Sequence, residues 1–423
     1  MRRLLLGVLS SAAAVSASAT PWHVMGPRAM GMGGAYTAIA QGPSAAYWNP
    51  AGLGQLYNTW GLEVPAGFRM EFTGAVLQGA NDLNDLNKTC SGAGAAGDCQ
   101  ARIDTALSHL GQPNNGAMLD AGGGAQFKFK EFVGFVTPLT YIGVTPRIDM
   151  VHNQAGPGAN SIADNTSKIV LNGGIFTEFG VGYGHEIKET GLVLGANLKG
   201  IVGKVGYASK NIVTDDPGSD FSNFTDNAKT TLQPGIDLGM LWDMRETWTK
   251  LPMRPRFAVV GRNINNPKFK QPDAAIAAGE ADKYPIHGQV RAGFALSPLK
   301  FWNVAADLDL TDNLTPVAGM RSRMLCLGTE VNIFNSPKFN IPLRVGLQKN
   351  VSTKADSALA YTGGFGLNFL HVMFDVAGMV SSKSTTLQSE GGSEKIPNNF
   401  GASARFALLF GGEDKGTRNK PGK

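Results

Sequence analysis

Hydrophobic residues occupy every second position of a long N-terminal segment, and this period constrains the fold more than any other feature. The alternate positions are Trp60, Leu62, Val64, Ala66, Phe68, Met70 and Phe72, while Glu63, Arg69 and Glu71 lie between them. A period of two predicts a β-strand with one apolar and one polar face. At about 3.3 Å per residue, this strand is long enough to cross the hydrocarbon layer of a membrane.

The same alternation recurs as far as the C-terminal region. It is clear within residues 169–183, 192–198, 232–242, 257–259, 290–296, 302–310, 325–333, 339–347, 359–369, 372–380 and 400–410. Two weaker strands fit near Gly123–Lys130 and Tyr141–His152. Together with the first segment, these patterns predict about fourteen strands.

The segments between the predicted strands alternate between long and short. The long ones cover about 74–121, 153–167, 208–230, 265–286, 311–322, 350–358 and 381–398, and the short ones about 131–140, 187–191, 245–254, 297–300, 334–338 and 370–371. Membrane barrels have short periplasmic turns and longer outer loops. We therefore predict an all-β fold, a transmembrane antiparallel up-and-down β-barrel of about 14 strands that spans residues 58–410. The long outer loop 74–121 is expected to form short helices at Asn81–Asn87 and Ala101–Leu110 that cap one mouth.

Charged residues in the predicted strands share the parity opposite to the apolar face, so they are expected to face the lumen. They are Arg69, Glu71, Glu178, Lys199, Asp237, Arg262, Arg291, Asp307, Asp309, Glu330, Arg344, Asp375 and Arg405. Because both signs are present, a ladder of ion pairs that braces the wall is one interpretation. A dedicated binding site in the lumen is the alternative.

The two ends of the chain carry their own signals. Met1-Arg2-Arg3, the apolar run from Leu4 to Val15 and Ala17-Ser18-Ala19 have the three parts of a secretory signal peptide, which we predict to span residues 1–19 and to be cleaved near Ala19. Residues 411–423 form a basic tail with Lys415, Arg418, Lys420 and Lys423. The net charge of +5 lies partly in this tail, so it is weak evidence for an acidic partner, and we expect no nucleic-acid partner.

Cysteines and histidines suggest no reaction chemistry. Cys90 and Cys99 lie close together in a Gly/Ala-rich loop of an exported chain, which predicts a local disulfide and leaves Cys326 over. The six histidines are scattered, and neither G-x-S-x-G nor H-E-x-x-H occurs. We expect no metal, no cofactor and no enzymatic activity.

Two N-terminal motifs carry a resemblance to a known family. They are Arg28-Ala29-Met30-Gly31-Met32-Gly33-Gly34-Ala35 and Tyr47-Trp48-Asn49-Pro50-Ala51-Gly52, and the last strand ends in Phe410. With these features the chain resembles the FadL/TodX-type outer-membrane barrels. Ala305-Ala306-Asp307-Leu308-Asp309-Leu310-Thr311 and Leu343-Arg344-Val345-Gly346 look like the TraF-like or PorV-like members.

The resemblance implies a location in the bacterial outer membrane, in contact with its lipid. It also implies that the glycine-rich run Gly26–Gly54, within a segment 20–57, folds back into the barrel as a plug, whereas composition alone is equally compatible with a linker. The plug residues carried over are Met30, Gly31, Gly33, Gly34, Asn49, Pro50, Ala51 and Gly52.

Two functions follow from this resemblance. FadL-type proteins take up hydrophobic molecules near the outer mouth and release them through a lateral opening, which implies passive uptake or binding of hydrophobic small molecules. TraF-like and PorV-like relatives are associated with conjugation or secretion assemblies, which implies docking of secretion or conjugation proteins without small-molecule transport.

Overall fold

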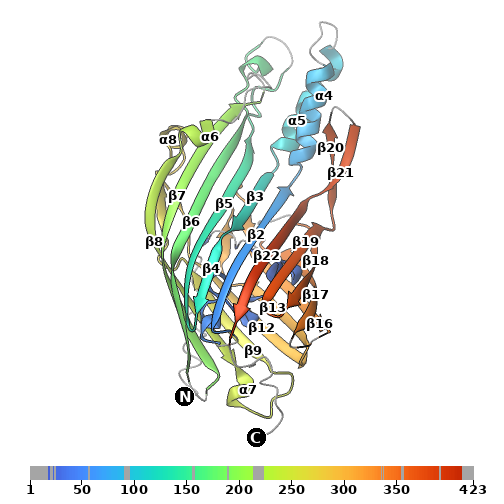
Figure 1. The fold of residues 1–423 in the computed structure, drawn as a ribbon. Coiled ribbons are helices and arrows are strands. Elements are labelled where there is room, and N and C mark those ends of the chain that lie inside the picture. The colour runs from blue at the N-terminus through green and yellow to red at the C-terminus, as the bar shows by residue number, and fades with distance from the viewer. Residues whose placement is uncertain are drawn as a thin grey trace, which may run out of the picture.

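The protein is a closed antiparallel β-barrel of fourteen strands in a computed structural model (Figure 1). The structure describes residues 18–19, 22, 25–55, 58–89, 96–154, 158–187, 190–212, 223–334, 336, 338–353, 357–389 and 392–411. The wall is formed by β2 (Trp60–Thr73), β3 (Gly116–Gly123), β4 (Ala125–Phe129), β5 (Phe132–Arg147), β6 (Lys168–Ile187), β7 (Leu192–Asn211), β8 (Lys229–Asp243), β9 (Arg256–Arg262), β12 (Gln289–Leu299), β13 (Trp302–Asp309), β16 (Met324–Ile333), β17 (Phe339–Asn350), β18 (Ala360–Phe369), β19 (Val372–Ser381) and β22 (Asn399–Phe410). Because β3 and β4 both pair with β2 and β5, they form one interrupted strand, and the predicted fold and strand number are confirmed.

The last strand closes the barrel on the first. β22 pairs with β2 from Trp60 opposite Phe410 to Glu71 opposite Asn399. Closure leaves no open sheet edge, as a lipid environment requires, because unpaired backbone groups are costly there. Short turns lie at one end of the barrel and long loops at the other (Figure 1). We call these the turn end and the loop end.

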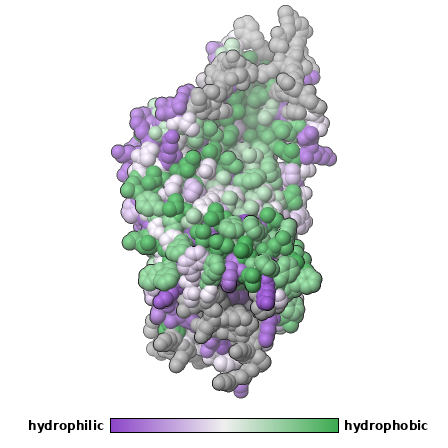
Figure 2. Space-filling model, in the orientation of Figure 1, coloured by the Kyte–Doolittle hydropathy of each residue, from purple (hydrophilic) through white to green (hydrophobic). Residues whose placement is uncertain are grey.

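The two faces of the wall differ in the way the alternation predicts. Large apolar side chains point outward, among them Leu198, which is 63% exposed, and Val345, which is 60% exposed. Figure 2 shows hydrophobic side chains over the middle of the wall and hydrophilic ones toward its two ends. Such an apolar belt suits contact with lipid. No helix in the described part of the chain is long and apolar enough to span a bilayer.

The strands between residues 116 and 147 differ from the prediction. β3 begins at Gly116, so the first long loop ends at residue 115 instead of 121. The predicted turn 131–140 and the predicted strand Tyr141–His152 are wrong, because β5 runs without interruption from Phe132 to Arg147. Its inward side chains, including Val133, Phe135 and Leu139, are as apolar as its outward ones. The period of two is therefore hidden in this strand.

Helices and a hairpin project from the loop end. The predicted helices of the first loop are longer than expected, and form α4 (Val76–Thr89) and α5 (Ala96–Leu110). They rise beside the hairpin of β20 (Ser384–Ser389) and β21 (Gly392–Pro397), where Asn81 Nδ2 donates to the Thr386 carbonyl at 2.7 Å (Figure 1). The pair therefore extends the wall on one side. Smaller helices lie at Ile162–Asp164 (η4) and Asn223–Asp226 (α6), whereas Met244–Thr247 (α7) lies at the turn end, between β8 and β9 (Figure 1).

The loop between β9 and β12 packs on inward-facing residues of the wall. It contains β10 (Lys268–Lys270), α8 (Asp273–Ala277) and β11 (Lys283–Pro285). Phe269 is fully buried against Phe176 of β6, with ring centroids 5.0 Å apart, and Tyr284 stacks on the same ring at 5.7 Å. This apolar core explains why inward positions of neighbouring strands are not polar.

Parts of the predicted ends lie outside the described residues. Of the predicted signal peptide, Ser18 and Ala19 (β1) pair in parallel with β14 (Asp312–Leu314), which also pairs with β15 (Arg321–Ser322). Residues 1–17 and 412–423 are not described. The signal peptide and its cleavage site stay predictions.

Candidate functional site: the plug and the lumen

The glycine-rich N-terminal segment lies inside the barrel. Four short helical turns follow one another there, α2 (Pro27–Gly31), η2 (Thr37–Ile39), α3 (Ala45–Trp48) and η3 (Pro50–Gly54). The residues carried over as plug residues are all buried: Met30, Gly31, Gly33, Gly34, Asn49, Pro50, Ala51 and Gly52. We call residues 25–55 the plug.

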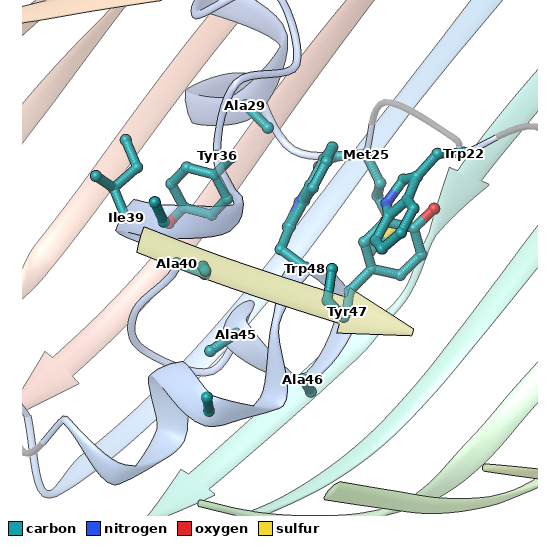
Figure 3. Packing of buried hydrophobic residues seen from close by; sticks show 14 of the residues in the cluster. Trp22, Met25, Ala29, Tyr36, Ile39, Ala40, Ala45, Ala46, Tyr47 and Trp48 are labelled. Carbon is teal, nitrogen blue, oxygen red and sulfur yellow. The ribbon is translucent and has the colours of Figure 1, made fainter. Parts of the chain in front are cut away.

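Aromatic side chains give the plug a core of its own. The Trp48 ring lies between Trp22, which stacks on it at 6.0 Å, and Tyr36, which meets it edge-on at 5.7 Å (Figure 3). Trp48 Nε1 donates to the Met25 carbonyl at 2.9 Å. The plug also buries Met30, Ile39 and Leu53, and the rings are the largest apolar groups in it.

Two arginines of the wall contact this aromatic core. The Arg262 guanidinium carbon lies 4.0 Å from the centre of the Tyr47 ring, and that of Arg291 lies 4.7 Å from the Trp22 ring. Both distances suit a cation–π interaction. Burial raises the pKa of Tyr47 to about 12, although Arg262 opposes the shift, so the phenol is neutral at physiological pH.

Glycines let the backbone of the plug touch the backbone of the wall. A Cβ on Gly346 of β17 would lie 2.3 Å from Gly33 N, and a Cβ on Gly328 of β16 would lie 2.3 Å from the Met32 carbonyl oxygen. Gly33 itself has a positive φ of 67°. No side chain fits at these positions without moving backbone. The small residues of the motif are therefore a steric requirement of the contact.

A second group of wall glycines receives the end of the plug. A Cβ on Gly195 of β7 would lie 2.3 Å from the Pro50 carbonyl carbon, and one on Gly239 of β8 would lie 2.1 Å from Asn49 Oδ1. Asn49 Nδ2 donates to the carbonyls of Thr37 and Met240 at 3.1 and 3.2 Å, while its Oδ1 accepts from Ala51 N. Asn49 thus ties two parts of the plug to the wall.

One carboxylate of the wall holds the middle of the plug. Asp307 Oδ2 accepts hydrogen bonds from Tyr36 N at 3.0 Å, Thr37 N at 2.9 Å and Thr37 Oγ1 at 2.5 Å. Thr37 begins the turn η2, so the carboxylate satisfies amide groups that this turn leaves without partners. The predicted inward residue Asp307 is therefore an anchor for the plug.

A chain of ion pairs connects the plug to the closing strands. Arg28 of the plug pairs with Glu330 at 2.7 Å, and Glu330 also pairs with Arg344. Arg344 pairs in turn with Asp375, which also pairs with Arg405. At the end of the chain, Arg405 lies 3.4 Å from Glu63. Arg344 of β17 reaches Asp375 of β19 across β18. The residues of β18 opposite these two are Gly364 and Gly366, which have no side chains in between. Burial alone would lower the pKa of the Arg28 guanidinium, but the Glu330 carboxylate outweighs it and raises the pKa.

The remaining predicted inward charges form separate pairs. Arg69 donates to Asp120 at 2.9 Å and lies 3.8 Å from Glu71. Lys199 pairs with Glu178 and Asp237 at 3.0 Å each, Arg262 pairs with Glu178 at 2.9 Å, and Arg291 pairs with Asp309 at 2.6 Å. The predicted set thus falls into several clusters along the wall, each holding opposite charges close together. Such pairs keep buried charges compensated.

Several residues at these contacts were missed by sequence reasoning. Asp120, Asn197 and Lys128 are buried and face the lumen. Arg28 belongs to the N-terminal motif, but the sequence did not indicate its ion pair with Glu330. Asp120 lies opposite Arg69 in the β2–β3 register, so a correct register would have found it. Trp22 precedes the glycine-rich run, where no period marks it.

The cysteines are only partly described. Cys99 is disulfide-bonded, while Cys90, its predicted partner, lies outside the described residues. Cys326 is a free, buried thiol beside Gly34. Within the described ranges, no group of three or more His, Cys, Asp or Glu residues is placed to hold a metal ion.

The wall is interrupted where β3 meets β4. Gly124 has φ 145°, and a Cβ there would lie 2.1 Å from the Val136 carbonyl oxygen. On either side lie Pro65 of β2 and Pro138 of β5, which have no N–H for the ladder. The pairings of β2 and β5 with β3 and β4 skip this level. The wall therefore has fewer hydrogen bonds here than on either side, and one that remains joins Gly124 N to the Pro65 carbonyl at 3.1 Å.

An apolar groove of about 640 Å³ covers the interruption on the outer face. It is lined mainly by small residues, including Ala66, Gly123 and Ala404. On the inner side lies Met25 of the plug, whose sulfur is 3.7 Å from the place of a Cβ on Gly122. A thin layer of Gly, Ala and Pro thus separates the outer surface from the plug.

A family model matches more than half of the chain. Residues 46–309 match the model of the family described as "F plasmid transfer operon, TraF, protein". No curated protein matches the chain.

Solved structures of channels share the fold. The chain is similar to the "TodX monoaromatic hydrocarbon channel deltaS2 mutant" (9% identity, 91% of this chain and 99% of that chain, TM-score 0.50). It is also similar to the "CymD monoaromatic hydrocarbon channel" (12% identity, 94% and 100%, TM-score 0.47) and to a Pseudomonas aeruginosa FadL homologue (10% identity, 94% and 98%, TM-score 0.45). At these identities the likeness concerns the fold alone.

Proposed function

The chain belongs to the family described as "F plasmid transfer operon, TraF, protein", and within it we propose an outer-membrane barrel for passive uptake or binding of hydrophobic small molecules. The proposed role involves no catalytic step. In the outer membrane, the turn end would face the periplasm and the loop end the exterior.

The interruption at Gly124 is the observation that carries this proposal. Opening a wall between two strands breaks their ladder hydrogen bonds, and each bond lost in lipid is costly. At the level of Pro65 and Pro138 fewer of these bonds exist, because neither proline has an N–H, although Gly124 N still donates to the Pro65 carbonyl at 3.1 Å. The apolar groove outside and Met25 inside face each other across this level. A hydrophobic molecule would exchange between lumen and lipid here at the lowest cost.

The packing of the plug favours a path through the wall over a path through the plug. Passage along the axis would have to separate Gly33 from Gly346 and Arg28 from Glu330. The first contact joins backbones, and the second leaves buried charges without compensation when it breaks. A side path needs neither change. The channels named above support this proposal by their fold only.

Filling the groove tests the proposal. Ala66→Phe with Ala404→Phe places two rings in the groove without touching the lumen, since both alanines face outward. Uptake of the hydrophobic dye N-phenylnaphthylamine by proteoliposomes should slow several-fold. Val345→Phe, on an outward position of β17, is the matched control and should leave uptake unchanged. Equal uptake by all three proteins would refute passage at this groove.

The alternative function is docking of secretion or conjugation proteins, and the loop-end projection favours it. The hairpin β20–β21 and the helix α4 support each other through Asn81 and Thr386, away from the lipid belt. Replacing residues 384–397 by a short turn should abolish co-purification of a specific partner and leave dye uptake intact, if docking is the function. Loss of uptake with no change in partners would instead favour transport.

A further inference from the structure

A polar cavity of about 470 Å³ lies at the turn end, between the plug and the turns of the wall. Its lining extends from β9 through β12, β13, β16, β17, β18, β19 and β22 to β2. The plug contributes Arg28, Tyr36, Gln41 and Gly42 to its lining. The volume is in the range of ligand-binding sites. We call it the turn-end cavity, and it is separate from the groove at Gly124.

The lining carries an excess of positive charge. Seven basic and two acidic side chains line the cavity. Three more acids contact these bases from behind: Asp375 touches Arg344 and Arg405, and Asp243 and Glu246 touch Arg254. Counting all five acids, an excess of two positive charges remains. A concave site with low-dielectric walls concentrates this field toward its opening.

The excess charge lies at the rim. Lys300, in the turn between β12 and β13, and Lys338, just before β17, are both exposed. Neither forms an ion pair with any residue that the structure describes. In contrast, Arg28, Arg344 and Arg405 deeper in the cavity are held by carboxylates. The two lysines are therefore available to an anionic group that enters from the turn end.

Amide side chains occupy much of the remaining lining. Six Asn and Gln residues face the cavity. Gln41, Asn332 and Asn368 among them are half-buried, so their amide groups border the cavity. A side-chain amide both donates and accepts hydrogen bonds. The lining can therefore pair with the N–H and C=O groups of a peptide backbone.

Together, these features point to one class of ligand. We propose that the turn-end cavity binds an acidic peptide segment, whose carboxylates contact Lys300 and Lys338 while its backbone groups hydrogen-bond to the amide side chains of the lining. A free inorganic anion would satisfy the lysines but has no peptide backbone to pair with these amides. Lipid lies outside the barrel, away from the lining. The chain's own tail is basic (Lys415, Arg418, Lys420, Lys423) and does not complement the rim.

Binding of a labelled peptide to the full-length protein in detergent tests the proposal, independently of dye uptake. The probe is fluorescent Gly-Glu-Gly-Glu-Gly-Glu, with Gly-Gln-Gly-Gln-Gly-Gln as its neutral counterpart. The acidic peptide should bind more tightly than the neutral one and weaken as NaCl is raised, because exposed charges are screened. Lys300→Glu with Lys338→Glu should weaken binding about tenfold or more.

The matched control reverses two lysines at the other end of the barrel. Lys283 of β11 and Lys395 of β21 are both exposed, so Lys283→Glu with Lys395→Glu changes the net charge equally and should leave the affinity within about twofold. Equal binding by the two double variants, or by the two peptides, would overturn the proposal. Displacement of the acidic peptide by an equal concentration of inorganic phosphate would reduce the cavity to a simple anion site, and so would also refute it.

Discussion

Gly346→Ala should loosen the plug without disturbing the barrel around it. The added Cβ would lie 2.3 Å from Gly33 N and 2.4 Å from the Met32 carbonyl carbon, so backbone has to move. Overpacking of a tight site costs about 1–3 kcal/mol. Because a free-energy change of about 1.4 kcal/mol is a factor of ten, the docked state of the plug should become about five to 150 times less favourable.

Cleavage by trypsin after Arg28 measures this change. The Arg28 side chain is 14% exposed and pairs with Glu330, so cleavage requires the plug to open locally. When opening and closing are fast relative to cleavage, the rate follows the population of the open state. In Gly346→Ala, the fragment that begins at Ala29 should therefore appear about five to 150 times faster, as quantified by mass spectrometry.

Gly363→Ala is the matched control. It lies on the neighbouring strand β18, opposite Val345, and its added Cβ would have Arg344 O, at 3.9 Å, as its nearest neighbour. Its cleavage should match that of the wild-type protein. If both variants are cleaved faster by the same factor, alanine in a strand is the cause rather than contact with the plug. If Gly346→Ala stays fully protected, the backbone contact between plug and wall is refuted.

Three further outcomes follow from the same structure. Asp307→Ala leaves Tyr36 N and both donors of Thr37 buried without their acceptor, so the free energy of unfolding in urea should fall by about 1–3 kcal/mol; an unchanged urea midpoint would contradict the anchor. The hydrogen bond from His152, aided by backbone amides and opposed by partial burial, holds the pKa of Asp149 below its usual range, so its contribution to loop stability is complete above the ordinary aspartate value and declines as pH falls through the lower folded one. The amide protection factors of residues 148–154, each the intrinsic exchange rate at that pH divided by the observed rate, should therefore fall between about pH 4 and pH 2, whereas Asp149→Asn should show lower protection already at pH 7 and lose less of it in acid. Alkylation of unfolded, unreduced protein should modify Cys326 and no other cysteine; modification of all three would exclude the predicted disulfide.

Much of the wall could be predicted because a closed sheet in lipid has only two environments. Wherever one face met lipid and the other met charged partners, as at Glu63, Arg69 and Arg344, alternation identified the strand and its inward side. Alternation did not identify β5, because Val133 and Leu139 pack against apolar residues in the lumen instead of facing water. Periodicity cannot distinguish a lipid-facing side from one that packs on a plug.

The contacts of the plug could not be predicted in the same way. In the sequence, Gly346 and Gly328 look like ordinary strand glycines. The need for glycine there comes from the backbone of Gly33 and Met32, which lie about three hundred positions away in the chain. The register of β2 and β3 is likewise needed before Asp120 can be assigned to Arg69. Local pattern gives the face of a side chain, but its partner across the lumen is set by closure of the whole barrel.

Whether the plug moves can be decided by combining two of these variants. If hydrophobic molecules pass through the wall at Gly124, the loosened plug of Gly346→Ala should leave dye uptake close to the wild-type rate, because β17 lies far around the sheet from the interrupted strand. Filling the groove with Ala66→Phe and Ala404→Phe should then slow uptake to the same extent in either background. If the plug itself is the gate, Gly346→Ala should accelerate uptake, and the filled groove should not prevent it. Unequal responses of the two backgrounds to groove filling would therefore refute a static plug, since independent sites contribute additively.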